Sequence, residues 1–157
     1  RLATRKPLWA KLSAAVSDVA EVARAAHDAG ADGLSLVNTV RGLALDERTQ
    51  RPILHQAVGG LSGPALKPIA LAAVYECYRA TRLPIVGMGG VQCGRDALDL
   101  VAVGARDVAL GTILFSDPDA PSRIRTELAN ELHARGYTDL DDAYAIVHAD
   151  SLSRATT

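Results

Sequence analysis

The sequence predicts an α/β fold and, within that class, about half of a TIM (β/α)8 barrel. Short apolar segments alternate with helical segments in the order β-α-β-loop-α-β-α-β-α-α. The strand segments are apolar throughout, as a parallel sheet covered by helices requires. An open doubly wound sheet would give the same pattern, but no GxGxxG follows the first strand. Glycine and polar residues end all four strands, which is where a barrel places its site.

Composition limits the classes of function. The 157 residues are 48% hydrophobic and 22% charged, with a net charge of -1, so nucleic acid is a poor candidate partner. No apolar run approaches the roughly 18 residues of a membrane span, and no secretory h-region is visible. Cys77 and Cys93 form neither a metal spacing nor a disulfide framework. A reducing, cytoplasmic setting is expected. The start at Arg1, almost directly before a strand, suggests a fragment, although a processed start would look the same.

The first elements are a strand, a helix and a second strand. Residues 7–13 are short and mostly apolar, with a proline at their entry. In residues 17–30, apolar residues share one helical face, Ser17 or Asp18 can cap the start, and Gly30 suits the position after the last turn. Residues 31–39 give a buried strand that ends in polar side chains.

A long connection, residues 40–63, follows the second strand. It exceeds the usual length of a βα loop, so we expect it to be functional or to carry a small hairpin of its own. The next helix spans 64–81. Pro64 fits its first turn, and Pro68 must also lie near its start because a deeper proline would break the helix.

The remaining segments continue the alternation. We predict a strand at 83–90, a helix at 94–104 and a strand at 106–112. The tail, 119–150, has the pattern of two helices separated at Gly136, with the acidic run 139–142 capping the second.

Two glycine turns end the last two strands. "GMGG" carries Gly89 and Gly90, and "LGT" carries Gly111, with 113–117 available as a short helix. In barrels a phosphate is often bound after the seventh and eighth strands, where glycine lets backbone N–H groups approach it. Two tight turns without a ligand are the alternative. The pair at successive strand ends favours one phosphate site, and hence the last four barrel units.

Other polar residues lie where the ligand's remaining parts would bind. Lys11, inside an apolar strand, is either a cation at the barrel mouth or a lysine that snorkels at a sheet edge. Asn38 and Thr39 end the second strand, and an amide there can both donate and accept hydrogen bonds. The three glycines of "VGGLSGPALKP" let a loop pass flat against a planar ring, or simply make a flexible turn.

Histidine and cysteine give weak signals. No HExxH or close His/Asp pairing occurs, so we expect surface or packing roles for the four histidines. Cys77 lies mid-helix and should pack. Cys93 follows the glycine turn near a helix start, where a reactive thiol is an alternative to a small packing residue.

Taken together, "KLS", "DAGADGLSLVNT", "GGLSGPALKP", "PIVGMGG", "GARDVALGT" and "FSDPDAP" resemble dihydroorotate dehydrogenase, in order and spacing, from about Pro7 to Pro121. The segment "NT…GGLSGPALKP…GMGG" is most similar to the type B subgroup of class 1. The resemblance implies that residues 1–157 are the C-terminal half of a single FMN-binding barrel domain. It also implies oxidation of dihydroorotate to orotate in pyrimidine biosynthesis.

Site residues and partners follow from the same resemblance. Lys11 should face the N1/O2 side of the flavin, and Asn38 and Thr39 should bind orotate. Type B implies an oligomer with a partner subunit that carries FAD and an iron–sulfur cluster and uses NAD. The catalytic base, a cysteine or serine in this family, is expected upstream of Arg1, so Cys93 is not that base. The implied FMN residues are Lys11, Val37, Gly63, Gly89, Gly90, Gly111 and Thr112.

Two other interpretations stay open at this point. The flavin barrel of dihydropyrimidine dehydrogenase shares much of this pattern but reduces uracil or thymine. A half-barrel that binds phosphate without catalysis would also fit the glycine turns.

Overall fold

A parallel four-stranded sheet forms the centre of the computed structural model, which describes residues 3–149. The strand order is β1-β2-β5-β6, so each strand pairs with the next parallel strand along the chain. A doubly wound sheet instead reverses its strand order at a switch point. The sequential order is that of a barrel wall. The strands are β1 Trp9–Leu12, β2 Gly33–Leu36, β5 Ile85–Met88 and β6 Asp107–Ala109.

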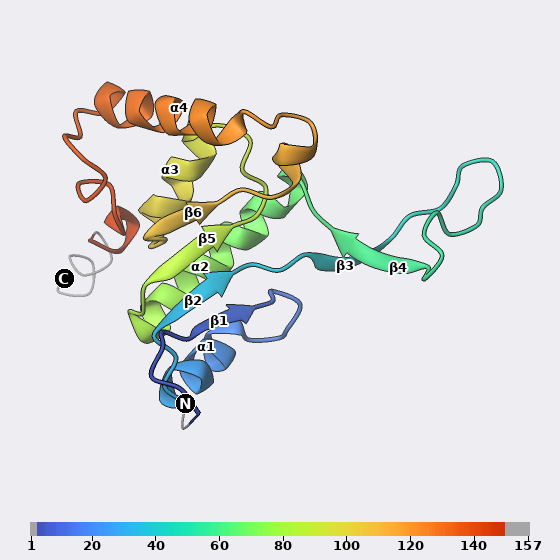
Figure 1. Cartoon of the computed structure of the whole chain (residues 1–157), viewed down its shortest axis with the longest axis horizontal. Helices are drawn as coiled ribbons and strands as arrows, with labels where there is room; N and C mark the ends of the chain where they lie inside the picture. Colours follow the sequence, from blue (N-terminus) through green and yellow to red (C-terminus); the bar gives the residue numbers. More distant parts are fainter. Residues whose placement is uncertain (1–2, 150–157) are drawn as a thin grey trace, which may run out of the picture.

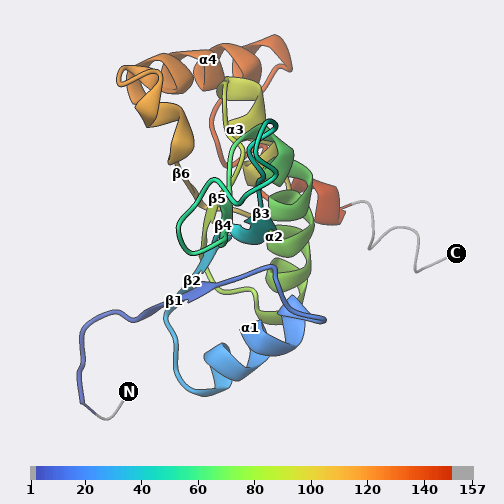
Figure 2. The same ribbon diagram turned by 90° about the vertical axis from the view of Figure 1, so that its right-hand side faces the viewer.

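Helices cover one face of this sheet (Figures 1 and 2). They are α1 Val19–Asp28, α2 Lys67–Thr81 and α3 Gly94–Ala102, and α4 Ala120–Ala134 packs on α3. The core lies between these helices and the strand side chains that point toward them, Leu34, Leu36 and Ile85, which are fully buried. Burial of these side chains is the main force that holds the strands in this register.

The predicted caps of α1 and the proline positions at the start of α2 are confirmed. The Asp18 carboxylate accepts a 2.9 Å hydrogen bond from the Glu21 N–H and so caps α1. Gly30 follows the last turn of α1 with a φ of 88°, a conformation that glycine adopts at little cost. Pro64 begins a short 3-10 helix, Pro64–Leu66, that leads into α2, and Pro68 lies in the first turn of α2.

The long connection contains the expected hairpin. Strands β3 Val40–Leu43 and β4 Val58–Leu61 pair antiparallel and extend away from the sheet (Figure 1). The hairpin begins directly after Thr39 and returns to Gly63. Both of its ends are therefore held beside the carboxyl end of β2.

The prediction of a second tail helix after Gly136 is wrong for the described residues. Asp139 and Asp142 accept hydrogen bonds from nearby N–H groups, as caps do, but they close turns. A 3-10 helix, Ile146–His148, follows. The Ala145 N–H bonds to the Val101 carbonyl at 3.0 Å, so the chain folds back onto α3 rather than continuing outward. Asp150, the last residue of the predicted helix, lies outside the described residues.

His148 and Cys77 are packing residues, as expected for the histidines and for the mid-helix cysteine. His148 is buried, lies 4.6 Å from the Tyr75 ring in a stacked arrangement, and has Nε2 3.0 Å from the Val103 carbonyl. Cys77 is fully buried, and burial raises the pKa of its thiol to about 12. Such a thiol is unreactive at neutral pH. No helix within residues 3–149 has the length and apolar character needed to cross a bilayer.

Close packing of α3 on α4 gives the first prediction. A Cβ at Gly94 would lie 2.3 Å from the Glu127 carbonyl carbon and the Leu128 nitrogen, both of them backbone atoms. We expect Gly94→Ala to lower the free energy of unfolding by about 1–3 kcal/mol, measured by chemical denaturation of the product of the complete gene. Gly42→Ala is the control, because its Cβ meets Leu61 at an ordinary 3.5 Å. Equal stability of the two variants would contradict the prediction.

Candidate functional site

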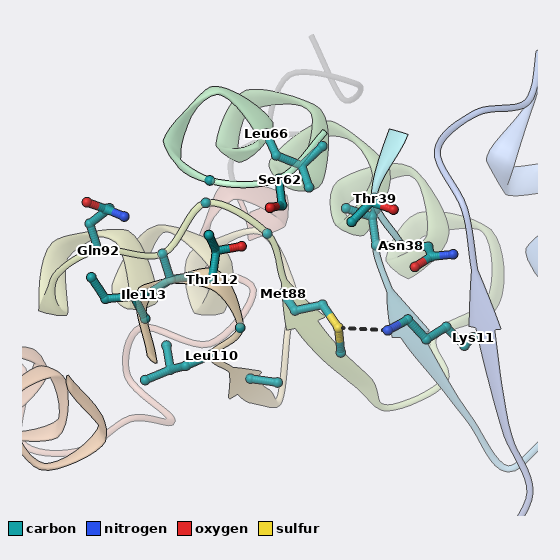
Figure 3. Close-up of a pocket in the computed structure, with 17 residues that line it drawn as sticks. Lys11, Asn38, Thr39, Ser62, Leu66, Met88, Gln92, Leu110, Thr112 and Ile113 are labelled. Atoms are coloured by element: carbon teal, nitrogen blue, oxygen red, sulfur yellow. Dashed lines mark hydrogen bonds between the residues drawn. The ribbon is translucent and has the colours of Figure 1, made fainter. Parts of the chain in front are cut away.

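One pocket opens at the carboxyl ends of the four parallel strands (Figure 3). Its volume is about 640 Å³, counting space open to solvent. All nine residues that the sequence predicts for cofactor or substrate line it. They are Lys11, Val37, Asn38, Thr39, Gly63, Gly89, Gly90, Gly111 and Thr112.

The two glycine turns form one end of this pocket. Gly89 and Gly90 have φ values of 128° and 75°, so a residue with a side chain would be strained at either position. Their missing side chains also give room to α2, since a Cβ at Gly90 would lie 2.6 Å from the Lys67 nitrogen. Gly111 differs, because it has a negative φ and no atom lies within 4 Å of its Cβ position. The predicted short helix follows it as the 3-10 helix Thr112–Phe115.

Gly87 lies near the end of β5, the strand that leads into the Gly89–Gly90 turn, but its small size is required by the core. A Cβ there would lie 2.7 Å from the Ala105 Cβ. Its small size therefore serves the packing of β5 against the segment that follows α3.

Lys11 and Asn38 lie toward the other end of the pocket (Figure 3). The Lys11 Nζ donates to the Met88 Sδ at 3.4 Å, across from β1 to β5. A thioether is a weak acceptor, and no ion pair of Lys11 is found within the described residues. Asn38 and Thr39 are exposed and directly follow β2, where the Asn38 N–H bonds to the Leu12 carbonyl at 3.0 Å. The lysine therefore lies at the edge strand and also faces the pocket.

Some lining residues were not singled out from the sequence. Ser62 precedes Gly63 within "GGLSGPALKP", and its hydroxyl is the feature of the sequence that could have marked it as a lining residue. Met88 lies inside "GMGG", and only the pairing of β1, β2 and β5 brings it opposite Lys11. The others are Leu66, Val91, Gln92, Ala109, Leu110 and Ile113.

Lys11 is the one ionisable side chain among the described residues that line the pocket. Cys93 does not line it. Its thiol instead takes part in the N-terminal capping box of α3, in which the Asp96 carboxylate accepts from the Cys93 N–H at 3.2 Å. Within residues 3–149, no three or more His, Cys, Asp or Glu side chains are placed to hold a metal ion.

An ion cluster lies behind the Gly89–Gly90 turn. The Lys67 ammonium contacts Asp96 at 2.5 Å and Asp99 at 2.8 Å, which joins the start of α2 to α3. Burial opposes the charge on Lys67, but the two carboxylates outweigh it and raise the pKa of Lys67. Burial would likewise raise the pKa of Asp96, yet hydrogen bonds from Lys67 and the Gln92 N–H lower that pKa below its ordinary value. All three groups are therefore charged at neutral pH.

A family profile described as dihydroorotate dehydrogenase matches residues 2–132. The chain belongs to the dihydroorotate dehydrogenase family. It is 44% identical over 145 residues to "Dihydroorotate dehydrogenase B (NAD(+)), catalytic subunit" of Desulforamulus reducens, covering 92% of this chain and 48% of that protein. It is 51% identical over 142 residues to a Solibacter usitatus protein provisionally named dihydroorotate dehydrogenase A (fumarate), covering 90% of this chain and 46% of that one.

Solved dihydroorotate dehydrogenase structures share the fold. The structure from Eimeria tenella in complex with ferulenol superimposes with a TM-score of 0.77 at 29% identity, covering 92% of this chain and 39% of that chain. The ligand-free structure from the same organism gives the same TM-score. The chain spans about half the length of the curated relatives it matches, and the prediction of about half a TIM barrel is confirmed.

The charge cluster behind the turn gives a prediction about pH. The pKa of Asp96 is lowered by folding, so its contribution to stability is present above its ordinary value of 3.8 and is lost as pH falls through the lower folded value. We expect Asp96→Asn to reduce the melting temperature at pH 6, and the gap from wild type to shrink below about pH 4. Asp28→Asn, at the exposed end of α1, is the control. A gap that stayed constant down to pH 3 would contradict this role of Asp96.

Proposed function

We propose that this chain carries the FMN pocket and part of the substrate site of a dihydroorotate dehydrogenase, which oxidises dihydroorotate to orotate in pyrimidine biosynthesis. The observation that carries the proposal is the convergence on one pocket at the strand ends of nine residues that the sequence and its family resemblance implied. Residues 1–157 would form the C-terminal half of a single barrel domain. The free thiols of Cys77 and Cys93 suit a reducing, cytoplasmic setting.

The lining residues fit a ligand with a phosphate at one end and a planar ring at the other. Backbone N–H groups of the glycine turns can approach a phosphate, and the open space at the Gly111 Cβ position leaves room for it. Gly63, with a φ of 92° and no atom within 4 Å of its Cβ position, leaves the opposite wall equally open. Val37 offers a buried, apolar surface beside these turns.

FMN, when bound, accepts the hydride of the oxidation. We assign Lys11 the role of a fixed positive charge that stabilises the negative charge developing on the ring side of the pocket. The Asn38 amide can donate to a substrate carbonyl and accept from a substrate N–H, and Thr39 adds a hydroxyl beside it. We place the proton-abstracting base outside residues 1–157.

The names of two relatives give two candidates for the electron acceptor. The Desulforamulus protein is named for NAD(+) and as a catalytic subunit. We therefore propose an oligomer with a second subunit that carries FAD and an iron–sulfur cluster and passes electrons to NAD. Fumarate, which is named for the Solibacter protein, is the alternative acceptor.

The decisive experiment on the pocket uses Gly111. A side chain at Gly90 would collide with the Lys67 backbone and disturb folding, whereas one at Gly111 enters open space. We expect Gly111→Val in the product of the complete gene to fold normally but to purify with less than about a tenth of the wild-type flavin, because the side chain occupies the phosphate position. The measurement is the flavin-to-protein absorbance ratio, combined with a thermal melt.

Gly42→Val on β3 is the matched control, since it adds the same side chain away from the pocket. Full flavin content in folded Gly111→Val protein would sink the assignment of this pocket to FMN.

Lys11 gives a separate kinetic prediction. A charge needed mainly while negative charge develops should affect the rate more than the affinity. We expect Lys11→Ala to slow flavin reduction by dihydroorotate at least about tenfold while the FMN dissociation constant changes less. Stopped-flow bleaching of the flavin measures the first quantity, and fluorescence titration measures the second. An unchanged bleaching rate would remove this role from Lys11.

A further inference from the structure

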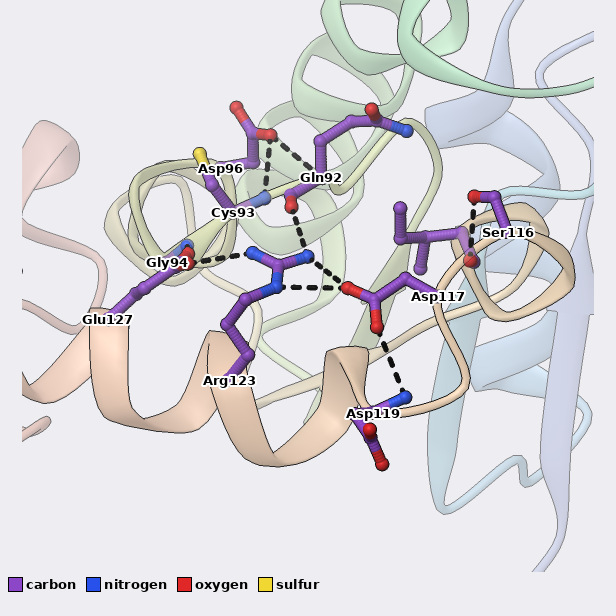
Figure 4. Close-up of polar contacts among 10 residues, drawn as sticks. Gln92, Cys93, Gly94, Asp96, Ser116, Asp117, Asp119, Arg123 and Glu127 are labelled. Atoms are coloured by element: carbon purple, nitrogen blue, oxygen red, sulfur yellow. Dashed lines mark hydrogen bonds and ion pairs between the residues drawn. The ribbon is translucent and has the colours of Figure 1, made fainter.

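Arg123, in the first turn of α4, lies outside the pocket and bonds to Gln92 and Asp117, in the segments that follow the two glycine turns (Figure 4). Its Nη2 donates to the Gln92 carbonyl at 3.2 Å, two residues after Gly90. Its Nε and Nη2 donate to Asp117 Oδ2 at 2.9 and 2.8 Å, and Asp117 follows the 3-10 helix that begins after Gly111. One guanidinium therefore holds the segments that follow both turns.

Few other hydrogen bonds link the segments that carry these turns, although Val91, Leu110 and Ile113 also pack on the common apolar core. The pairing of β5 with β6 ends at Met88 and Ala109, before either glycine turn begins. Beyond that pair, the hydrogen bonds found within residues 3–149 join the segments after the two turns only through Arg123. The sheet thus fixes where the turns start, and Arg123 is the hydrogen-bonded link between the segments that continue from them.

The partners of Arg123 are themselves held in place. Asp117 accepts from the Asp119 N–H at 3.1 Å through its other oxygen. Arg123 Nη1 donates to Glu127 Oε1 at 2.7 Å, and Glu127 Oε2 accepts from the Gly94 N–H at 2.8 Å, at the start of α3. Hydrogen bonds from Arg123 and from the Gly94 N–H lower the pKa of Glu127, so this carboxylate remains a charged partner at neutral pH.

We propose that Arg123 is a positioning residue for the cofactor phosphate, which sets the spacing of the two glycine turns without touching the ligand. This inference rests on the proposed function. Its four hydrogen bonds and two carboxylate partners occupy the guanidinium, and Arg123 does not line the pocket. A phosphate held by backbone donors requires these donors at fixed positions, and a displacement of about 1 Å is enough to weaken such a site strongly.

A positioning role and a purely structural role differ in which ligand they affect. Riboflavin has the ring of FMN but lacks its phosphate. If Arg123 only holds α4 against α3, its removal should weaken binding of both flavins equally or lower the melting temperature alone. If it spaces the turns, only the share of affinity that depends on the phosphate should fall.

The experiment titrates FMN and riboflavin, separately, into the apoprotein made from the complete gene. For Arg123→Ala we expect FMN binding to weaken about tenfold or more and riboflavin binding to change less than about twofold, because only the phosphate contacts move. The FMN affinity of Arg123→Lys should lie between those of wild type and Arg123→Ala. A single ammonium group cannot reproduce the forked guanidinium that bonds to Asp117 and Gln92 together. Arg135→Ala is the matched control. That arginine pairs with Glu131 on the same helix and contacts neither turn.

Asp117→Asn decides the matter if Arg123→Ala does not fold. The amide can still accept from the Asp119 N–H but loses the charge that anchors the guanidinium, so FMN binding alone should weaken. The wild-type protein should bind FMN more tightly than riboflavin. If it does, but the variants weaken binding of both flavins equally or of neither, the role of Arg123 is overturned and the proposed function stays intact. Wild-type apoprotein that binds neither flavin would overturn the proposed function and this inference with it.

Discussion

The parallel pairing of four successive strands is the constraint on which the rest of the structure depends. Because β1, β2, β5 and β6 run in the same direction and pair in chain order, their carboxyl ends meet at one edge of the sheet. Lys11, Asn38, Gly89 and Gly111 are far apart in the sequence, yet each lies within or just after such a strand. The pocket follows from this pairing, and the helices that bury Leu34, Leu36 and Ile85 hold the pairing in register.

Chemistry at the strand ends is possible because the stabilising interactions lie elsewhere. The apolar core occupies the helix side of the sheet, while the charged clusters of Lys67 and Arg123 lie behind the glycine turns. The buried lining residues of the pocket, Val37, Leu66 and Val91, belong to this core. The polar residues of the pocket add little to the stability of the fold: Lys11 has a thioether as its hydrogen-bond acceptor, and Asn38 and Thr39 are exposed. These polar side chains are therefore available to a ligand, and contacts outside the pocket hold the strand ends that carry them in place.

Much of this could be predicted from sequence, for a physical reason. Glycine, proline and capping residues act locally, so the ends of α1 and α2 and the positions of the glycine turns were visible in the chain. The tail after Gly136 could not be predicted in the same way. Its residues have helical propensity, but the bond from the Ala145 N–H to the Val101 carbonyl is a tertiary contact. The links from Arg123 to Gln92, 31 positions earlier, and from Lys67 to Asp96 are equally invisible, because nothing in the spacing of such residues marks them as partners.

Different physical reasons account for glycine at each of these pocket positions, and only some of these reasons point to a ligand. Gly89 and Gly90 need a positive φ and also meet α2, so backbone geometry and packing already explain them. Gly63 has open space around it, but its φ of 92° is reason enough for glycine. At Gly111 neither crowding nor a positive φ applies, and the residue lines the pocket beside Thr112. Open space at this position in the pocket wall is compatible with the close approach of a ligand group to the backbone, as we propose for the phosphate.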